Sequence, residues 1–279
     1  MGKISNRKVF YKMSKLKAIF DPIFEELSQV KEEIIIVLKQ AYKHDIFTMK
    51  VIENYFNSQG KLLRPALIIL SAKSLSNPHP QNNSSMIKVA TAIELIHNAS
   101  LIHDDIIDNS ELRRGIKTIN KQYNNQIAVL IGDLLYTEAL SILVNNFDSK
   151  IMAIIIKCIT QMTLGEVFNL GKSTLSLQDY MRIIKDKTAS FMCICCKIGA
   201  MLACNDGEKI NSLEQFGFNF GVAYQLIDDF KDKDISQDLK LNSIKEAKEY
   251  INMAKDNIKF LPLPKYKNSL ESLANFIVE

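Results

Sequence analysis

The sequence predicts an all-α protein, a single domain built as a bundle of roughly ten or more helices. The 279 residues are 47% hydrophobic and 24% charged, which is enough for one sizeable core. Only 10 glycines and 6 prolines occur, and such low numbers favour long helices over a turn-rich β architecture. Apolar residues also recur three and four positions apart along much of the chain, as expected for helices with one buried stripe.

The first half of the chain divides into helices at recognisable boundaries. Between Leu16 and Tyr55 the apolar spacing predicts two helices with one buried stripe each. Lys61 to Ser74 predicts a nearly all-apolar helix entered at Arg64-Pro65, where proline suits the first turn. The polar stretch Asn77 to Ser85 predicts a loop. A helix from Met86 onward then leads into an aspartate cluster.

The second half contains the most apolar helices. Residues 127–144 and 151–167 are hydrophobic nearly all round, which predicts two helices buried at the centre of the bundle. Within the first of them, Asp133 is either a buried polar group facing a basic cluster or a helix-terminus residue. Tyr180 to Ala203 predicts another helix, and a later one carries Gln225 into a second aspartate cluster.

Charge and cysteine content exclude several classes of protein. The net charge of +4 is mild, and the lysines are spread along the chain rather than gathered into a nucleic-acid patch. The five cysteines lack a second Cys or His pair at zinc spacing, which favours reduced core residues in a cytosolic protein. We expect no transmembrane segment, because no apolar run reaches about 18 residues. The basic start of the chain is interpreted as an end leading into the first helix, although organellar import or organelle encoding stays open.

Two aspartate clusters carry the chemistry. Asp104 and Asp108 are four residues apart, so they share one face of a helix, with Asp105 beside them. Carboxylates about 4 Å apart repel by roughly 4 kcal/mol at an effective dielectric of 20, so such a cluster needs a cation or protons. Oxygen ligands without His or Cys suit Mg²⁺. The same spacing recurs far downstream in Asp228, Asp229 and Asp232.

Basic residues accompany these clusters: Lys61, Arg64, Arg113, Arg114 and Lys187. Guanidinium forks bind phosphate oxygens in a bidentate manner, and lysine acts as a point charge. Together with magnesium-binding carboxylates, they indicate a substrate that carries a diphosphate. The alternative is that they neutralise the aspartates in surface ion pairs, each worth about 0–1 kcal/mol.

From about Leu16 to the C-terminus, the ordered motifs GKxxRP, HxxSLIHDDIIDxxxxRRG, GDLL, KTA and YQLIDD resemble the trans-type isoprenyl diphosphate synthases, or polyprenyl synthetases. The resemblance implies the isoprenoid synthase fold, with helices around a central apolar cavity. It also implies head-to-tail transfer of an allylic diphosphate onto isopentenyl diphosphate to give an all-trans, long-chain polyprenyl diphosphate. A homodimer in the cytoplasm and three Mg²⁺ ions per site, clamped between the two aspartate clusters, belong to the same expectation.

The resemblance also suggests roles for single residues. Mg²⁺ with Arg113 and Lys187 would stabilise the departing diphosphate. The catalytic residues implied are Lys187, Thr188, Arg113 and Gln225. The second substrate's diphosphate would be held by Lys61, Arg64, His97 and Arg114. The six aspartates would be the metal ligands.

Product length forms a separate hypothesis. Ala99 and Ser100 lie one turn before Asp104 and are small where short-product relatives tend to carry an aromatic residue. One helical turn of roughly 5 Å is about one isoprene unit, so a small side chain there lets the product pass toward Ile96. The sequence therefore favours a long product, and Ala99→Phe should shorten it.

The C-terminal part departs from the family's pattern. The chain is shortened between about residues 240 and 245, where the family has further helices, and its usual Gly-Lys pair is absent, with Lys231, Lys233 and Lys240 as uncertain substitutes. The missing helices favour a second hypothesis, a non-catalytic or regulatory subunit of a heteromeric synthase, while the intact aspartate clusters oppose it. A third possibility is a terpene cyclase, which GKLLRP and RRG oppose because they serve a second diphosphate.

Overall fold

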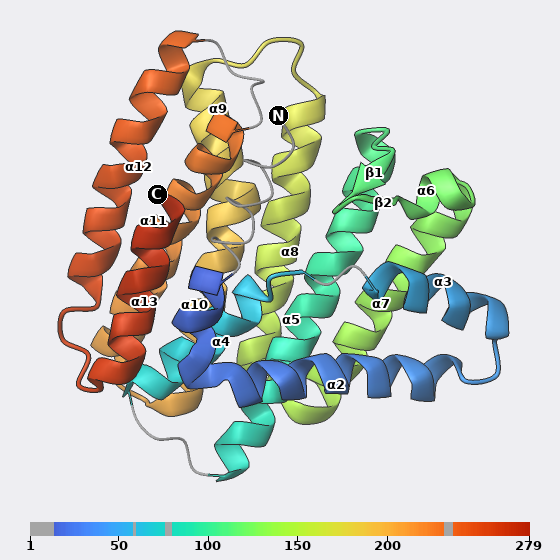
Figure 1. The fold of residues 1–279 in the computed structure, drawn as a ribbon, viewed down its shortest axis with the longest axis horizontal. Helices are drawn as coiled ribbons and strands as arrows, with labels where there is room; N and C mark the ends of the chain where they lie inside the picture. The colour runs from blue at the N-terminus through green and yellow to red at the C-terminus, as the bar shows by residue number, and fades with distance from the viewer. Residues whose placement is uncertain (1–13, 58–59, 76–79, 232–236) are drawn as a thin grey trace. The chain divides into compact units, whose positions relative to one another are not determined.

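The computed structural model describes residues 14–57, 60–75, 80–231 and 237–279, and it confirms the all-α prediction (Figure 1). Besides helices, the described residues contain only a two-stranded ribbon. The chain forms two compact units, each described by itself. That the chain is a single domain shortened near residues 240–245 stays a prediction.

One unit comprises Glu25–Pro65 and Asn83–Asp148. Its elements are α2 (Phe24–Tyr42), α3 (Ile46–Phe56), most of α5 (Pro80–Ile107), β1 (Leu112–Arg113), β2 (Ile116–Lys117), α6 (Ile119–Gln122) and α7 (Asn125–Asn146). Helix α3 begins after Asp45, whose carboxylate accepts a hydrogen bond from the Thr48 amide at 3.0 Å. In the same way, the side chain of Asn124 caps the start of α7. The ribbon β1–β2 directly follows the end of α5 (Figure 1).

The other unit comprises the described parts of Met1–Phe24, Ala66–Asn82 and Ser149–Glu279. It contains a helical segment over residues 14–20, η1 (Asp21–Ile23), most of α4 (Leu63–Leu75), α8 (Ser149–Leu170), α9 (Leu177–Ile184), η2 (Lys185–Ala189), α10 (Ser190–Ala203), α11 (Gly207–Lys231), α12 (Gln237–Asn257) and α13 (Pro264–Ile277). Helix α11 packs against both α10 and α12 (Figure 1). A capping box between Ser176 and Asp179 begins α9.

The predicted helix boundaries hold with two corrections. The loop predicted for Asn77 to Ser85 is wrong from Pro80 onward, because α5 already begins there, and residues 77–79 lie outside the described residues. Proline fits there because it lacks an amide hydrogen, and the amide hydrogens in the first turn of a helix have no partner within the helix. The helix predicted from Tyr180 to Ala203 is instead α9 and α10 joined by η2, a π-helical turn.

The prediction that both very apolar helices are buried at a bundle centre is wrong. On α7, Val129, Leu130 and Val144 are exposed; on α8, Ile156, Leu164, Val167 and Leu170 are exposed. By length and composition alone, each of the two helices could also cross a membrane, a test that core helices of soluble proteins pass as well. The absence of a transmembrane segment therefore stays a prediction.

Candidate functional site

The first aspartate cluster ends α5, and its three carboxylates have different surroundings. Asp104 is half-buried and Asp108 exposed, whereas Asp105 is only 2% exposed. Arg113 Nε donates to both Asp105 oxygens, at 2.8 and 2.9 Å, and Arg113 Nη2 lies 2.7 Å from Oδ1. Burial acts to lower the pKa of Arg113, but the hydrogen bonds and charge of Asp105 raise it above its ordinary value. Asp105 is thus held in a bidentate ion pair, while Asp104 and Asp108 form the common helix face.

The ribbon after α5 supplies the two arginines. Its turn has positive φ angles at Arg114 (53°) and Gly115 (83°), as required by the tight turn between Arg113 and Ile116. A non-glycine residue in this region carries some backbone strain. The motif RRG therefore has a geometric reason: its glycine allows the turn that holds Arg113 against Asp105.

Arg64 and His97 form a second polar contact in the same unit. Arg64 Nη1 lies 2.8 Å from His97 Nε2. Because arginine only donates, His97 Nε2 accepts, and the ring proton is on Nδ1. Burial, and then the charges of Arg64, Arg114 and Arg113, hold the pKa of His97 well below its ordinary value, so the ring is neutral. Lys61 is exposed just before α4.

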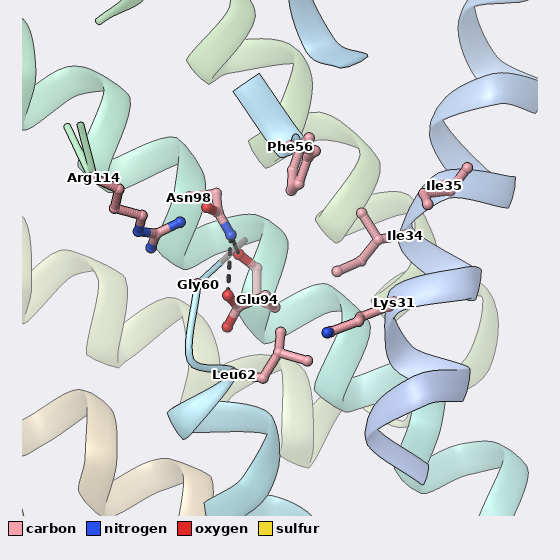
Figure 2. A pocket seen from close by; sticks show the side chains of 9 residues that line it. All are labelled: Lys31, Ile34, Ile35, Phe56, Gly60, Leu62, Glu94, Asn98 and Arg114. Atoms are coloured by element: carbon pink, nitrogen blue, oxygen red, sulfur yellow. Dashed lines mark hydrogen bonds between the residues drawn. The ribbon is translucent and has the colours of Figure 1, made fainter. Parts of the chain in front are cut away.

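A buried acid near these basic residues was missed by the sequence reasoning. Glu94 is 3% and Asn98 is 3% exposed, and Figure 2 shows both lining a small pocket with Arg114. Asn98 Nδ2 donates to Glu94 Oε1 at 3.3 Å, and the hydroxyl of Tyr55 donates to Asn98 Oδ1 at 3.2 Å. A glutamate in the middle of the apolar run AIELIHNASLI is the signal that could have found it.

The proposed product-length residues differ in burial. Ala99 and Ile96 are fully buried, whereas Ser100 is half-buried and donates to the carbonyl of His97 at 2.8 Å. Ile96, Ser100 and Asp104 are spaced four apart and therefore share one helix face. Ser100, more than Ala99, lies in line with the aspartates.

Asp133 occupies neither of its two predicted environments. Its side chain is 60% exposed in the middle of α7, and its Oδ1 lies 3.6 Å from His103 Nε2. The partner residue, His103, had been given no role from the sequence.

In the other unit, hydrogen bonds connect three candidate residues with a fourth residue that the sequence did not suggest. Thr188 Oγ1 donates to Gln225 Oε1 at 2.8 Å, and Gln225 Nε2 donates to Asp229 Oδ1 at 2.7 Å. The hydroxyl of Tyr180 donates to Asp229 Oδ2 at 2.7 Å. Burial, then the hydrogen bond and charge of Asp229, raise the pKa of Tyr180, so Tyr180 stays a donor. Tyr180 lies 49 positions from Asp229, and no motif in the sequence marks it.

Lys187 and Thr188 both belong to the π-helical turn η2, a feature often found at functional sites. Lys187 Nζ lies 2.6 Å from Glu166 Oε2 on α8, a second partner that the sequence did not predict. Close packing fixes this turn. A Cβ at Gly221 of α11 would lie 2.6 Å from Ala189 Cα, so glycine is needed there. Gln225 follows one turn later on the same face of α11.

The second aspartate cluster is only partly described. Asp228 is exposed and Asp229 half-buried, and Asp232 lies outside the described residues. Among the residues that the structure does describe, no three His, Cys, Asp or Glu side chains form a ready-made metal group. That the two clusters meet across one cavity stays a prediction.

Three of the remaining candidates add little. Lys231 is exposed at the end of α11, Lys233 lies outside the described residues, and the side chain of Lys240 is not described.

All five cysteines are free, and Cys158, Cys195 and Cys196 are buried, as expected for reduced core residues. Burial raises the pKa of the Cys196 thiol to about 12, which makes it unreactive.

The chain is similar to several known proteins in sequence and in fold. Residues 47–242 match the polyprenyl synthetase family model. A prenyl transferase from Porphyra purpurea is 34% identical over 224 residues, which cover 79% of this chain and 68% of the relative. An octaprenyl diphosphate synthase from Haemophilus influenzae is 35% identical, over 62% of this chain and 52% of the relative. The crystal structure of a geranylgeranyl pyrophosphate synthetase from Pyrococcus horikoshii superposes with a TM-score of 0.84 at 26% identity, over 94% of this chain and 98% of that one.

Proposed function

Because this chain belongs to the polyprenyl synthetase family, we propose that it is a trans-prenyltransferase that joins isopentenyl diphosphate to an allylic diphosphate and makes a polyprenyl diphosphate. The chain spans between about half and two thirds of the length of the two curated relatives described above, so activity and substrates are proposals for this chain. The relatives' names, prenyl transferase and octaprenyl diphosphate synthase, support a catalytic role over that of a regulatory subunit.

One observation carries the proposal. The C-terminal end of α5 carries a carboxylate face, Asp104 and Asp108. The same unit holds the guanidinium groups of Arg64, at the start of α4, and of Arg114, in the ribbon, together with neutral His97. The carboxylate face suits a diphosphate bound through a metal ion, and the guanidinium groups suit a diphosphate bound directly. A condensation of two diphosphate substrates needs both.

The carboxylates fit magnesium. Asp104, Asp108 and Asp228 provide hard oxygen donors, which suit an ion that keeps several waters and shares substrate phosphates. When bound, Mg²⁺ would supply positive charge to the departing diphosphate of the allylic substrate. The chain's own Arg113 and Lys187 would add fixed positive charge there, each held in place by a carboxylate, Asp105 and Glu166.

The remaining residues would bind and orient the second substrate. Arg64 and Arg114 would hold the diphosphate of isopentenyl diphosphate, and the proton on Nδ1 makes neutral His97 a hydrogen-bond donor to it. The allylic substrate loses diphosphate to give an allylic cation, the double bond of isopentenyl diphosphate attacks that cation, and a proton is then lost. We assign no general base, and the released diphosphate would accept this proton.

Purified full-length chain tests the proposal directly. Incubation with isopentenyl diphosphate, farnesyl diphosphate and Mg²⁺ should give products longer in steps of five carbons, and excess EDTA should stop their formation. Asp104→Asn should lower turnover strongly, whereas Glu53→Gln, an exposed acid on α3, should not. Absence of any extended product would contradict the proposal, and consumption of the allylic diphosphate alone would indicate a cyclase.

We further propose that the protein is a cytoplasmic homodimer. The exposed apolar residues of α7 and of α8 support assembly, because monomers rarely leave long apolar helix faces in water. Light scattering after gel filtration would test it, and a monomer at micromolar concentration would contradict it.

A further inference from the structure

Glu94 is a buried acid that the proposed reaction does not use. It lies on α5, one turn before His97, and is 3% exposed. Its Oε1 accepts the hydrogen bond from Asn98, whereas its Oε2 is buried and accepts none from the part of the chain that the structure describes. An ionised carboxylate in this position is costly, because burial removes its hydration and only one of its oxygens is compensated.

The surroundings of Glu94 carry positive charge. The pocket that it lines has a volume of about 50 Å³ and also includes Lys31, Gly60 and Arg114 (Figure 2). The guanidinium of Arg114 packs on Gly60, where a Cβ would lie only 2.8 Å from Arg114 Nη2. The titratable and charged groups around Glu94 are Lys31 from α2, Tyr55 from α3, Arg64 from α4, His97 from α5 and Arg114 from the ribbon.

These neighbours decide the charge of Glu94 near neutral pH. Burial raises the pKa of Glu94 to about 7, against the opposing effects of Arg64, the hydrogen bond from Asn98, and Arg114. Tyr55 and His97 stay neutral, since burial raises the pKa of the former and lowers that of the latter. The two arginines that favour ionised Glu94 are thus the ones expected to hold a diphosphate.

We propose that Glu94 is a proton-linked positioning residue: its carboxylate balances Arg64 and Arg114 before a diphosphate binds, and it takes up a proton when the diphosphate replaces it as their counter-charge. The inference rests on the proposed function, which makes these arginines a diphosphate site. The proton passes from solvent or buffer to the Glu94 carboxylate, and no other bond changes. Neutralising the arginines removes the field that favoured the carboxylate, so the protonated form prevails.

Two measurable consequences follow. Binding of a diphosphate takes up as much as one proton, depending on how far Glu94 is ionised beforehand. By linkage, affinity then falls by up to about tenfold per pH unit above neutrality. Glu94→Gln keeps the shape of the protonated acid and should bind without this proton and with a weaker dependence on pH.

Calorimetric titration of the full chain with inorganic diphosphate at pH 7.5, in buffers with different ionisation enthalpies, counts the protons. The wild type should take up more protons per diphosphate than Glu94→Gln. Protons taken up by the ligand itself are common to both proteins, so they drop out when the two counts are subtracted. Glu94→Asp, which keeps an acid, should retain part of the uptake, and Glu53→Gln should behave as wild type.

Equal proton uptake by wild type and Glu94→Gln would overturn the inference, as would loss of binding in a Glu94→Gln protein that still folds, as shown by a cooperative thermal transition. If that variant does not fold, Glu94→Asp decides: no uptake with binding intact overturns the inference. A wild type that binds no diphosphate overturns it too. Proton-linked binding without any prenyl transfer would contradict the proposed function alone.

Discussion

The ring of His103 lies directly on Gly132. A Cβ at Gly132 would be 2.2 Å from His103 Nε2, and the same nitrogen lies 3.2 Å from the carbonyl of Val129. The glycine of the motif GDLL therefore gives space to the histidine that precedes Asp104. This contact fixes α5 against α7 next to the first aspartate cluster.

Gly132→Ala should therefore displace the His103 ring. We expect a loss of about 1–3 kcal/mol in stability, as for other overpacking substitutions, and lower turnover because Asp104 follows His103. Thermal unfolding and steady-state kinetics measure the two effects. Gly207→Ala is the control, since a Cβ there meets no atom within 4 Å. The double variant Gly132→Ala, His103→Ala should regain the stability lost in Gly132→Ala. If it does not, a clash with the His103 ring is not the cause of the loss.

Glu94 should make stability depend on pH. Its pKa is raised by burial from 4.5 to about 7, so its protonated form favours the folded state. The stabilisation that protonated Glu94 gives the folded state is fully present below pH 4.5 and is lost as pH rises through 7. The free energy of unfolding falls by at most about 3 kcal/mol over this range. Urea unfolding of wild type and Glu94→Gln at pH 5 and pH 8 measures it. Relative to the wild type, the variant should be more stable at pH 8 than at pH 5, and a difference that is the same at both pH values would show that burial does not raise this pKa.

Asp105 and Asp108 of the first aspartate cluster should have different roles. Asp105→Asn removes half of a largely buried ion pair with Arg113 and should cost about 3–5 kcal/mol. Asp108→Asn alters an exposed residue and should reduce turnover at low Mg²⁺ with little change in stability. Measuring the unfolding free energy and the Mg²⁺ dependence of each variant distinguishes them. Equal effects on stability would contradict different roles.

Spacing alone predicted a good part of this site, because four residues along a helix always return to one face. It predicted the common face of Asp104 and Asp108, whereas the helix that begins near Arg64 was predicted from its apolar sequence and from Pro65. It could not predict the Asp105–Arg113 pair, which depends on a ribbon with positive φ angles at its turn. The exposed apolar face of α7 was misjudged, because the hydrophobicity of a helix does not say which of its apolar residues other helices cover.

Tyr180 should orient Asp229. Tyr180→Phe removes one hydrogen bond to a carboxylate, worth about 1–3 kcal/mol, and leaves the hydrogen bond that Gln225 donates to Asp229 in place. We expect a higher Mg²⁺ concentration for half-maximal turnover, measured at saturating substrates. Tyr123→Phe, on a ring that packs on Phe47 in the other unit, should not change it. An unchanged Mg²⁺ dependence in Tyr180→Phe would show that the hydroxyl does not position the second cluster.

Ser100 should control product length more than Ala99. Ser100 is half-buried and four residues before Asp104, whereas Ala99 is fully buried, so a phenyl ring at position 99 would overpack the unit. Ser100→Phe should shorten the products with little change in stability, and Ala99→Phe should lower stability by about 1–3 kcal/mol. Chromatography of the dephosphorylated products, together with thermal unfolding, separates the two effects. Products of unchanged length from Ser100→Phe would mean that the growing chain does not pass along the face of α5 that carries Ile96, since a ring at position 100 would otherwise stand in its path.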